Sequence, residues 1–143
     1  MEEIMGRTLV KARIESLRDL YEVQKGELKR GEARVVEVPD ALVDTGATML
    51  SMPRRLIKKL GLKKVRKRRI RTAMGETETT VYDAVRLTIQ GRDCTIDVAE
   101  VAEGCPVLIG QVPLELMDFV VDPGKKCLVG NPAHGGEHLI ELL

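Results

Sequence analysis

The sequence has 143 residues, a length that predicts one domain with a single modest core. Hydrophobic residues make up 43% and charged residues 31%, which excludes a disordered or fibrous protein, and the net charge of +1 excludes a polycation. Aromatic residues make up only 2% and Trp is absent, so aliphatic side chains must form the core and a base-stacking surface for nucleic acid is disfavoured.

The cysteines and the N-terminal stretch indicate a cellular compartment. Cys94, Cys105 and Cys127 match no zinc motif, and their odd number argues against a disulfide framework. The stretch MEEIMGRT lacks the basic-then-apolar pattern of a signal peptide, and no apolar run approaches the ~20 residues of a membrane span. We therefore expect a cytoplasmic protein with reduced thiols, no membrane partner, no metal and no cofactor.

Short apolar runs between turn signals predict an all-β fold with short helices. The unbroken apolar triplet Ala41-Leu42-Val43 predicts a strand buried on both faces, which ends at Asp44. Ser51, Pro53 and Gly61 then mark the two ends of a helix of about two turns. In chain order we expect a strand at 8–14, a hairpin or long loop at 17–31, a strand at 33–38, the apolar strand at 41–43 and the helix within 51–61.

The second half follows a similar order without repeating the sequence. A polar hairpin surrounds Gly75, a longer hairpin turns at residues 90–93, and an apolar run leads through Gly110 into another short helix. The expected elements are hairpin arms at 69–74 and 77–81, strands at 81–89 and 94–101, the apolar run at 106–110, a helix at 113–117, a strand at 118–121 and a loosely held tail from Asn131 to Leu143.

Three stretches together resemble the retroviral-type aspartic proteases: ALVDTGAT at 41–48, the hairpin around Ala73-Met74-Gly75, and VLIG at 107–110 before a short helix. The resemblance spans roughly residues 8–122. It implies a retropepsin-like acid-protease barrel with short helices, one lobe per chain, closed by homodimerisation. We assign residues 1–130 to this domain and residues 131–143 to a C-terminal tail.

The chemistry of that family gives Asp44 a role. Aspartic proteases hydrolyse peptide bonds with two carboxylates that share one proton, one acting as base on a water while the other polarises the carbonyl. The chain has one Asp-Thr-Gly, and in FVVDPG Pro123 stands where the Thr hydroxyl is needed, so we do not assign Asp122 as the second acid. The second carboxylate is expected from Asp44 of another copy, in a two-fold homodimer that cleaves peptides or proteins.

The resemblance also implies roles for the neighbours of Asp44. Thr45 would hydrogen-bond across the dimer, and Gly46 would let its backbone approach the carboxylate closely. Ala47 stands where pepsin-like enzymes usually have Ser, so the ionised dyad lacks one hydrogen bond and a milder pH optimum is expected. The remaining expected site residues are the flap tip that closes over substrate, Met74, Gly75 and Glu76, and the support beneath the loop, Leu108, Ile109 and Gly110. This flap has a single Gly and a charged Glu, unlike the Gly-rich retroviral flaps.

Other interpretations stay open. Asp-Thr-Gly also fits an ordinary turn, and an inactive dimer with the same fold is a further alternative. Residues 53–72 contain eleven basic and no acidic residues, a run that could neutralise phosphates. A solvated surface is the favoured interpretation of this run, recruitment of acidic substrates is another, and a β-barrel module that binds nucleic acid through residues 54–71 is the main alternative to an enzyme.

His134 and His138 are four residues apart, the spacing of a zinc pair on a helix. Gly135-Gly136 disfavours that helix, and no Glu directly follows the first His as in metalloproteases. We therefore expect a mobile tail in place of a metal site.

Overall fold

The computed structural model describes residues 7–142. The strands are β1 Thr8–Ser16, β2 Val35–Val43, β3 Leu50–Pro53, β4 Lys64–Thr72, β5 Gly75–Ile89, β6 Arg92–Val101, β7 Leu108–Ile109, β8 Phe119–Asp122 and β9 Cys127–Gly130. The helices are α2 Leu17–Gln24, α3 Arg54–Lys59 and α4 Gln111–Leu116, with 3-10 turns η1 Arg30–Glu32 and η2 Pro132–His134. The fold is mostly β, as the sequence predicts.

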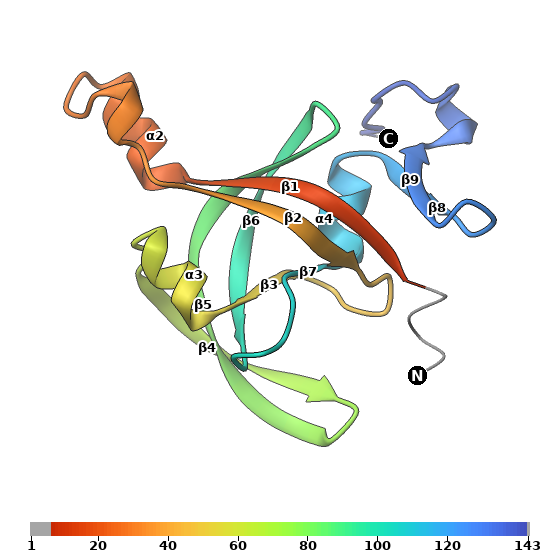
Figure 1. Cartoon of the computed structure of the whole chain (residues 1–143), viewed down its shortest axis with the longest axis horizontal. Helices are drawn as coiled ribbons and strands as arrows, with labels where there is room; N and C mark the ends of the chain where they lie inside the picture. The colour runs from red at the N-terminus through yellow and green to blue at the C-terminus, as the bar shows by residue number, and fades with distance from the viewer. Residues whose placement is uncertain (1–6, 143) are drawn as a thin grey trace.

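Seven strands form one sheet in the order β1-β2-β7-β3-β6-β5-β4 (Figure 1). β1 also pairs with β5, with Arg13 opposite Thr88, so six of these strands close into a ring. β4 stays outside the ring and pairs only with β5. The hairpin of β4 and β5, drawn in green, therefore projects beyond the rest of the sheet.

The ring encloses an aliphatic core. Along β1, Val10, Ala12 and Ile14 are buried while the residues between them face solvent, the period of two expected for a strand with one face on the core. Each fully buried Leu, Ile or Met side chain contributes roughly 1.5–3 kcal/mol relative to an exposed one. The largest fully buried side chains include Ile14, Leu50, Met52, Ile57, Leu60, Leu87, Ile89, Ile109, Leu114 and Met117.

The three cysteines are free, as predicted. Cys94 is buried in the core, Cys105 is exposed and Cys127 is half-buried. Burial raises the pKa of Cys94 to about 11, so this thiol stays protonated and unreactive at neutral pH.

Both predicted hairpins are present. Gln90 and Gly91 join β5 to β6 with φ angles of 50° and 80°, as a two-residue hairpin turn with left-handed central residues requires. The hairpin of β4 and β5 is longer than predicted, because β4 already begins at Lys64. In the helix near residue 57, the N-cap is Pro53 and not Ser51, which lies within β3, whereas Gly61 ends the helix with a φ of 66° as expected.

The prediction of a hairpin or loop over residues 17–31 is wrong. This segment forms α2 and then η1, because Ser16 Oγ accepts a hydrogen bond from the Asp19 backbone N–H at 3.2 Å and caps the helix. Asp19 is buried and accepts two hydrogen bonds from the Arg34 side chain, at 2.8 and 2.9 Å. Arg34 lowers the pKa of Asp19 through these hydrogen bonds, and the pair ties α2 to the chain just before β2.

Residues 35–43 form one strand, β2, where the sequence suggests two. Opposite Pro39-Asp40 the register of β1 shifts between Val10 and Ala12, so a bulge accommodates the proline. Ala41 and Val43 are buried, but Leu42 between them is only half-buried. The expectation that this triplet is buried on both faces is therefore only partly met.

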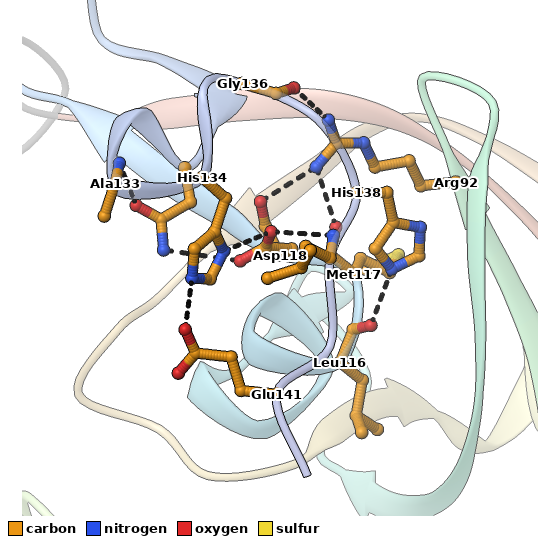
Figure 2. A network of polar contacts seen from close by, with 11 residues as sticks. Arg92, Leu116, Met117, Asp118, Ala133, His134, Gly136, His138 and Glu141 are labelled. Atoms are coloured by element: carbon orange, nitrogen blue, oxygen red, sulfur yellow. Dashed lines mark hydrogen bonds and ion pairs between the residues drawn. The ribbon is translucent and has the colours of Figure 1, made fainter. Parts of the chain in front are cut away.

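The C-terminal tail is anchored, which corrects the prediction of a loosely held segment. β8 and β9 form a separate two-stranded sheet. The tail that follows β9 folds back onto Asp118, just before β8, through a cluster that we call the tail anchor: Arg92, Asp118, Asn131 and His134. Figure 2 shows Arg92, Asp118 and His134 of this cluster. The buried Asp118 carboxylate lies 2.8 Å from His134 Nδ1 and accepts hydrogen bonds from the Leu139 backbone N–H at 3.1 Å and from Asn131 Nδ2 at 3.3 Å.

Arg92, the first residue of β6, completes the tail anchor. Its guanidinium donates to the backbone carbonyls of Met117, Asp118 and Gly136 (Figure 2). It also lies over the Phe119 ring, 4.8 Å from the ring centre. Among residues 7–142, none of the helices is long and apolar enough to cross a membrane.

Candidate active site

Asp44 lies at the carboxyl end of β2, where backbone pairing fixes its position. β2 runs parallel to β7, with Leu42 opposite Leu108 and Val43 opposite Ile109. The Asp44 backbone N–H continues this pairing and donates to the Ile109 carbonyl at 2.9 Å. The strand order therefore delivers the half-buried Asp44 side chain to the rim of the ring, where a loop of residues 44–49 begins.

The turn after Asp44 holds its carboxylate. The Gly46 backbone N–H donates to Asp44 Oδ1 at 3.0 Å, and the Ala47 backbone N–H donates to the Asp44 carbonyl at 3.0 Å. A Cβ on Gly46 would lie 3.3 Å from Asp44 Oδ1, so glycine lets the backbone approach the carboxylate. Within the described part of the chain this is the one hydrogen bond that the carboxylate receives, while Thr45 and Gly46 are exposed.

Of the three residues expected to support the loop, Leu108 pairs with strands β2 and β3, Ile109 accepts the Asp44 N–H, and Gly110 lies directly against the loop. Gly110 N–H donates to the Met49 carbonyl at 2.9 Å, and the next two N–H groups, at the start of α4, donate to the carbonyls of Ala47 and Thr48 at 2.8 and 3.0 Å. A Cβ on Gly110 would lie 2.5 Å from the Met49 carbonyl oxygen, so any other residue would push the loop away. The first N–H groups of α4, which have no partner within the helix, are thus satisfied by the loop.

The predicted flap tip is the turn between β4 and β5. Met74 is 96% exposed, and Gly75 has a φ of 113°, in the region that favours glycine. Thr72 Oγ1 accepts from the Met74 backbone N–H at 3.1 Å and closes the turn. Among residues 7–142, no hydrogen bond joins Met74, Gly75 or Glu76 to Asp44 of the same chain.

Glu76 has a role that sequence reasoning missed. Its two carboxylate oxygens accept from Arg69 and Arg71, at 2.9 and 3.0 Å, and these hydrogen bonds lower the pKa of Glu76. The carboxylate therefore joins the two arms of the hairpin of β4 and β5. Alternation along β4 was the available signal, since Arg69 and Arg71 point to the same face.

The remaining acidic and histidine candidates have structural partners. Asp122 Oδ1 accepts from the backbone N–H groups of Gly124 and Lys125, at 3.0 and 3.2 Å, in the turn between β8 and β9. His134 belongs to the tail anchor, and His138 Nε2 lies 3.1 Å from the Leu116 carbonyl. Residues 7–142 contain no group of three or more His, Cys, Asp or Glu placed to hold a metal ion.

Comparison with known proteins places this geometry in a family. Residues 30–112, more than half of the chain, match the model of a family described as aspartyl protease, which lies in the retropepsin-like clan. No curated protein matches the chain. The matched region contains the Asp44 loop, the hairpin of β4 and β5, and Gly110. The chain therefore belongs to the aspartyl protease family of the retropepsin-like clan.

Proposed function

We propose that this protein is an aspartic endopeptidase whose active unit is a homodimer with one Asp44 carboxylate from each subunit. The observation that carries the proposal is the Asp-Thr-Gly turn, which holds Asp44 Oδ1 on the Gly46 N–H and leaves Thr45 and Gly46 exposed at the end of β2. An exposed loop at this position is suited to meet its own copy across a two-fold axis.

The need for a second carboxylate supports the dimer. Hydrolysis by this route requires two carboxyl groups that share one proton, and a single Asp cannot act as base and acid at once. Asp122, the other Asp that precedes a Gly-containing turn, is engaged by two backbone N–H groups of that turn. A second chain would supply the missing carboxylate with the same loop geometry.

The reaction then balances within the dyad. The ionised Asp44 removes a proton from water while the oxygen attacks the peptide carbonyl, and the protonated Asp44 of the other subunit hydrogen-bonds the carbonyl oxygen. Collapse of the tetrahedral intermediate breaks the C–N bond, and the leaving nitrogen takes up one proton. The dyad ends with the single proton with which it began.

Neighbouring residues would position these groups. Thr45 would hydrogen-bond its counterpart loop across the dimer, and the Gly46 N–H holds one oxygen of the nearby carboxylate. The flap tip at Met74, Gly75 and Glu76 would close over an extended substrate. Leu108, Ile109 and Gly110 would keep the loop in place from below.

The test compares Asp44→Asn with the matched change Asp122→Asn. Both chains should fold and dimerise, because the amide is nearly isosteric with the carboxyl, but only Asp44→Asn should lose cleavage of a broad peptide library. Wild-type cleavage should also be blocked by a statine-type inhibitor, which resembles the tetrahedral intermediate. Appreciable cleavage by the Asp44→Asn chain would contradict the proposal.

A further inference from the structure

The charges of this nearly neutral chain are strongly segregated. Of its 23 Lys and Arg residues, eleven lie within residues 53–72, which contain no acid. The rest of the chain has the other 12 basic residues against all 22 acidic ones. The segment 53–72 therefore carries a concentrated positive charge that the net charge of +1 conceals.

Six of these cations lie on β4, the outer arm of the flap hairpin. Eight of the nine β4 residues are exposed, and the Arg69 and Arg71 side chains are 80% and 82% exposed. The cations of β4 are Lys64, Arg66, Lys67, Arg68, Arg69 and Arg71.

Few carboxylates neutralise this strand. Glu76 is shared between Arg69 and Arg71, and Arg66 lies 3.5 Å from Asp97. The other three β4 cations, Lys64, Lys67 and Arg68, form no ion pair with any residue in the described range 7–142. On α3, by contrast, Arg54 and Arg55 are each paired with a glutamate.

β4 is also the open edge of the sheet. It pairs with β5 on one side only, so every second residue directs its backbone N–H and C=O away from the sheet. Such an edge can accept an extended peptide as an added strand. Charged residues also protect edges against aggregation, but either sign of charge would do that, whereas β4 carries one sign alone.

We propose that β4 binds acidic residues that flank the scissile bond, so that the substrates of this enzyme are acidic, extended polypeptide segments. This inference rests on the proposed proteolytic function. Peptide is favoured over nucleic acid because residues 64–81 contain no aromatic side chain on which bases could stack.

The first measurement is binding to the full-length Asp44→Asn chain, which prevents turnover. Two fluorescent peptides share one apolar centre and differ in their flanks, Asp and Glu in one and Asn and Gln in the other. At about 0.05 M salt the acidic peptide should bind about tenfold more tightly, and the preference should shrink at about 0.5 M salt as the charges are screened. Equal affinities at low salt would overturn the inference.

The second measurement assigns the preference to β4. Lys67→Glu with Arg68→Glu should abolish it, and Lys67→Gln with Arg68→Gln, which only removes charge, should reduce it. The control, Lys58→Glu with Lys59→Glu on α3, makes the same change in net charge at exposed residues off the strand and should keep the preference. An equal loss of preference in the α3 control would show that net charge, and not β4, sets the preference, and would overturn the inference. A change in oligomeric state of the β4 variants alone, measured by sedimentation, would attribute the loss to altered assembly and would also overturn it.

Two further outcomes separate the inference from the function on which it rests. Cleavage by wild type with equal kcat/KM for both peptides would reject the acidic preference and leave the protease intact. A β4-dependent binding preference without any cleavage would contradict the proteolytic function while the acidic-peptide surface stands. Tighter, β4-dependent binding of a mixed-sequence oligonucleotide than of the acidic peptide would overturn the inference in favour of nucleic acid.

Discussion

Gly46 and Gly110 lie on either side of the Asp44 loop, and each leaves room for a different kind of neighbour. A Cβ on Gly46 would meet a carboxylate oxygen at 3.3 Å, and that oxygen can turn with the side chain. A Cβ on Gly110 would meet three backbone atoms of residues 47–49, the nearest at 2.5 Å. These backbone atoms belong to the loop itself. Of the two glycines, Gly110 is therefore the one at which an added side chain would disturb the loop more.

Gly110→Ala should therefore displace the loop and abolish cleavage, with a loss of about 1–3 kcal/mol in the free energy of unfolding. Gly31→Ala is the matched control, because Gly31 has open space around its Cβ position and needs no left-handed φ. Urea unfolding and peptide cleavage of the two variants provide the comparison. A Gly110→Ala chain with wild-type activity would show that the loop does not need this support.

Ala47→Ser tests how hydrogen bonds to the dyad set its pH range. The dyad is active while it holds one proton, so activity follows a bell-shaped curve of pH. A Ser hydroxyl that donates to the ionised carboxylate favours the charged form and moves the optimum toward acid. We expect a downward shift of less than about one pH unit, because one partly solvated hydrogen bond supplies less than the 1.4 kcal/mol of a full unit. An unchanged or alkaline-shifted profile on the same peptide would contradict this account.

At the scale of elements, α2 and the tail depart furthest from the sequence-based expectation, for different reasons. The Ser16-x-x-Asp19 spacing is a local helix start signal that the prediction of a loop overlooked in a polar segment rich in Gly. The tail has no such signal. The tail contacts Asp118, which has a left-handed φ of 59° and whose carbonyl accepts from Arg92 of the distant β6. No local pattern in the sequence predicts this arrangement.

The tail anchor should make stability depend on pH through His134. The Asp118 hydrogen bond raises the pKa of His134, and the His134 hydrogen bond lowers the pKa of Asp118. The His134 contribution is therefore complete below its unfolded-state pKa of about 6.5 and is lost as the pH rises through the folded-state value. The Asp118 contribution is present above about 3.9 and is lost as the pH falls through its own lowered value.

His134→Gln should thus be less stable than wild type at about pH 5.5 and lose the decline in stability toward about pH 8.5. Urea unfolding measures this, and hydrogen exchange at the Leu139 amide, which donates to Asp118, reports on the tail directly. His138→Gln is the control and should keep the wild-type decline. Glu141 lies 3.2 Å from His134 Nε2 and adds to the same effect, so Glu141→Gln should weaken the dependence without removing it. Identical pH profiles for wild type and His134→Gln would contradict the assignment.

At the scale of the whole molecule, the sequence predicts the individual strands better than the closure of these strands into a ring. Alternation and turn residues locate β1, the hairpins and the apolar run before Gly110, and the residues 41–48 predict the family that the comparison then shows. The pairing of β1 with β5, which closes the ring, joins segments far apart in the chain and leaves no local signature. The same holds for the site. The Asp44 loop is one short stretch of sequence and could be predicted, whereas its contact with Gly110 joins residues about 60 positions apart and could not.

A dimeric active unit should respond to dilution and to mixing. Specific activity should fall on dilution, and a threefold excess of the Asp44→Asn chain should lower wild-type activity to about one quarter, because exchange leaves that share of wild-type subunits in pairs with two carboxylates. The control chain carries Asp44→Asn together with Thr45→Arg, a change meant to prevent dimerisation. Because this chain cannot pair with wild type, an equal excess of it should leave wild-type activity unchanged. Full specific activity in a species that sediments as a monomer would contradict the dimer.

Only main-chain groups join the Asp44 loop to the start of α4: the carbonyls of residues 47–49 accept the N–H groups of residues 110–112. Peptide groups are common to nearly all amino acids, so the architecture of the site prescribes little about the identity of Thr48, Met49 or Val112. Two of these, Thr48 and Val112, are exposed. Selection can therefore vary the side chains beside the reacting groups while the loop geometry is inherited unchanged, and directed evolution of altered specificity has its most permissive positions here.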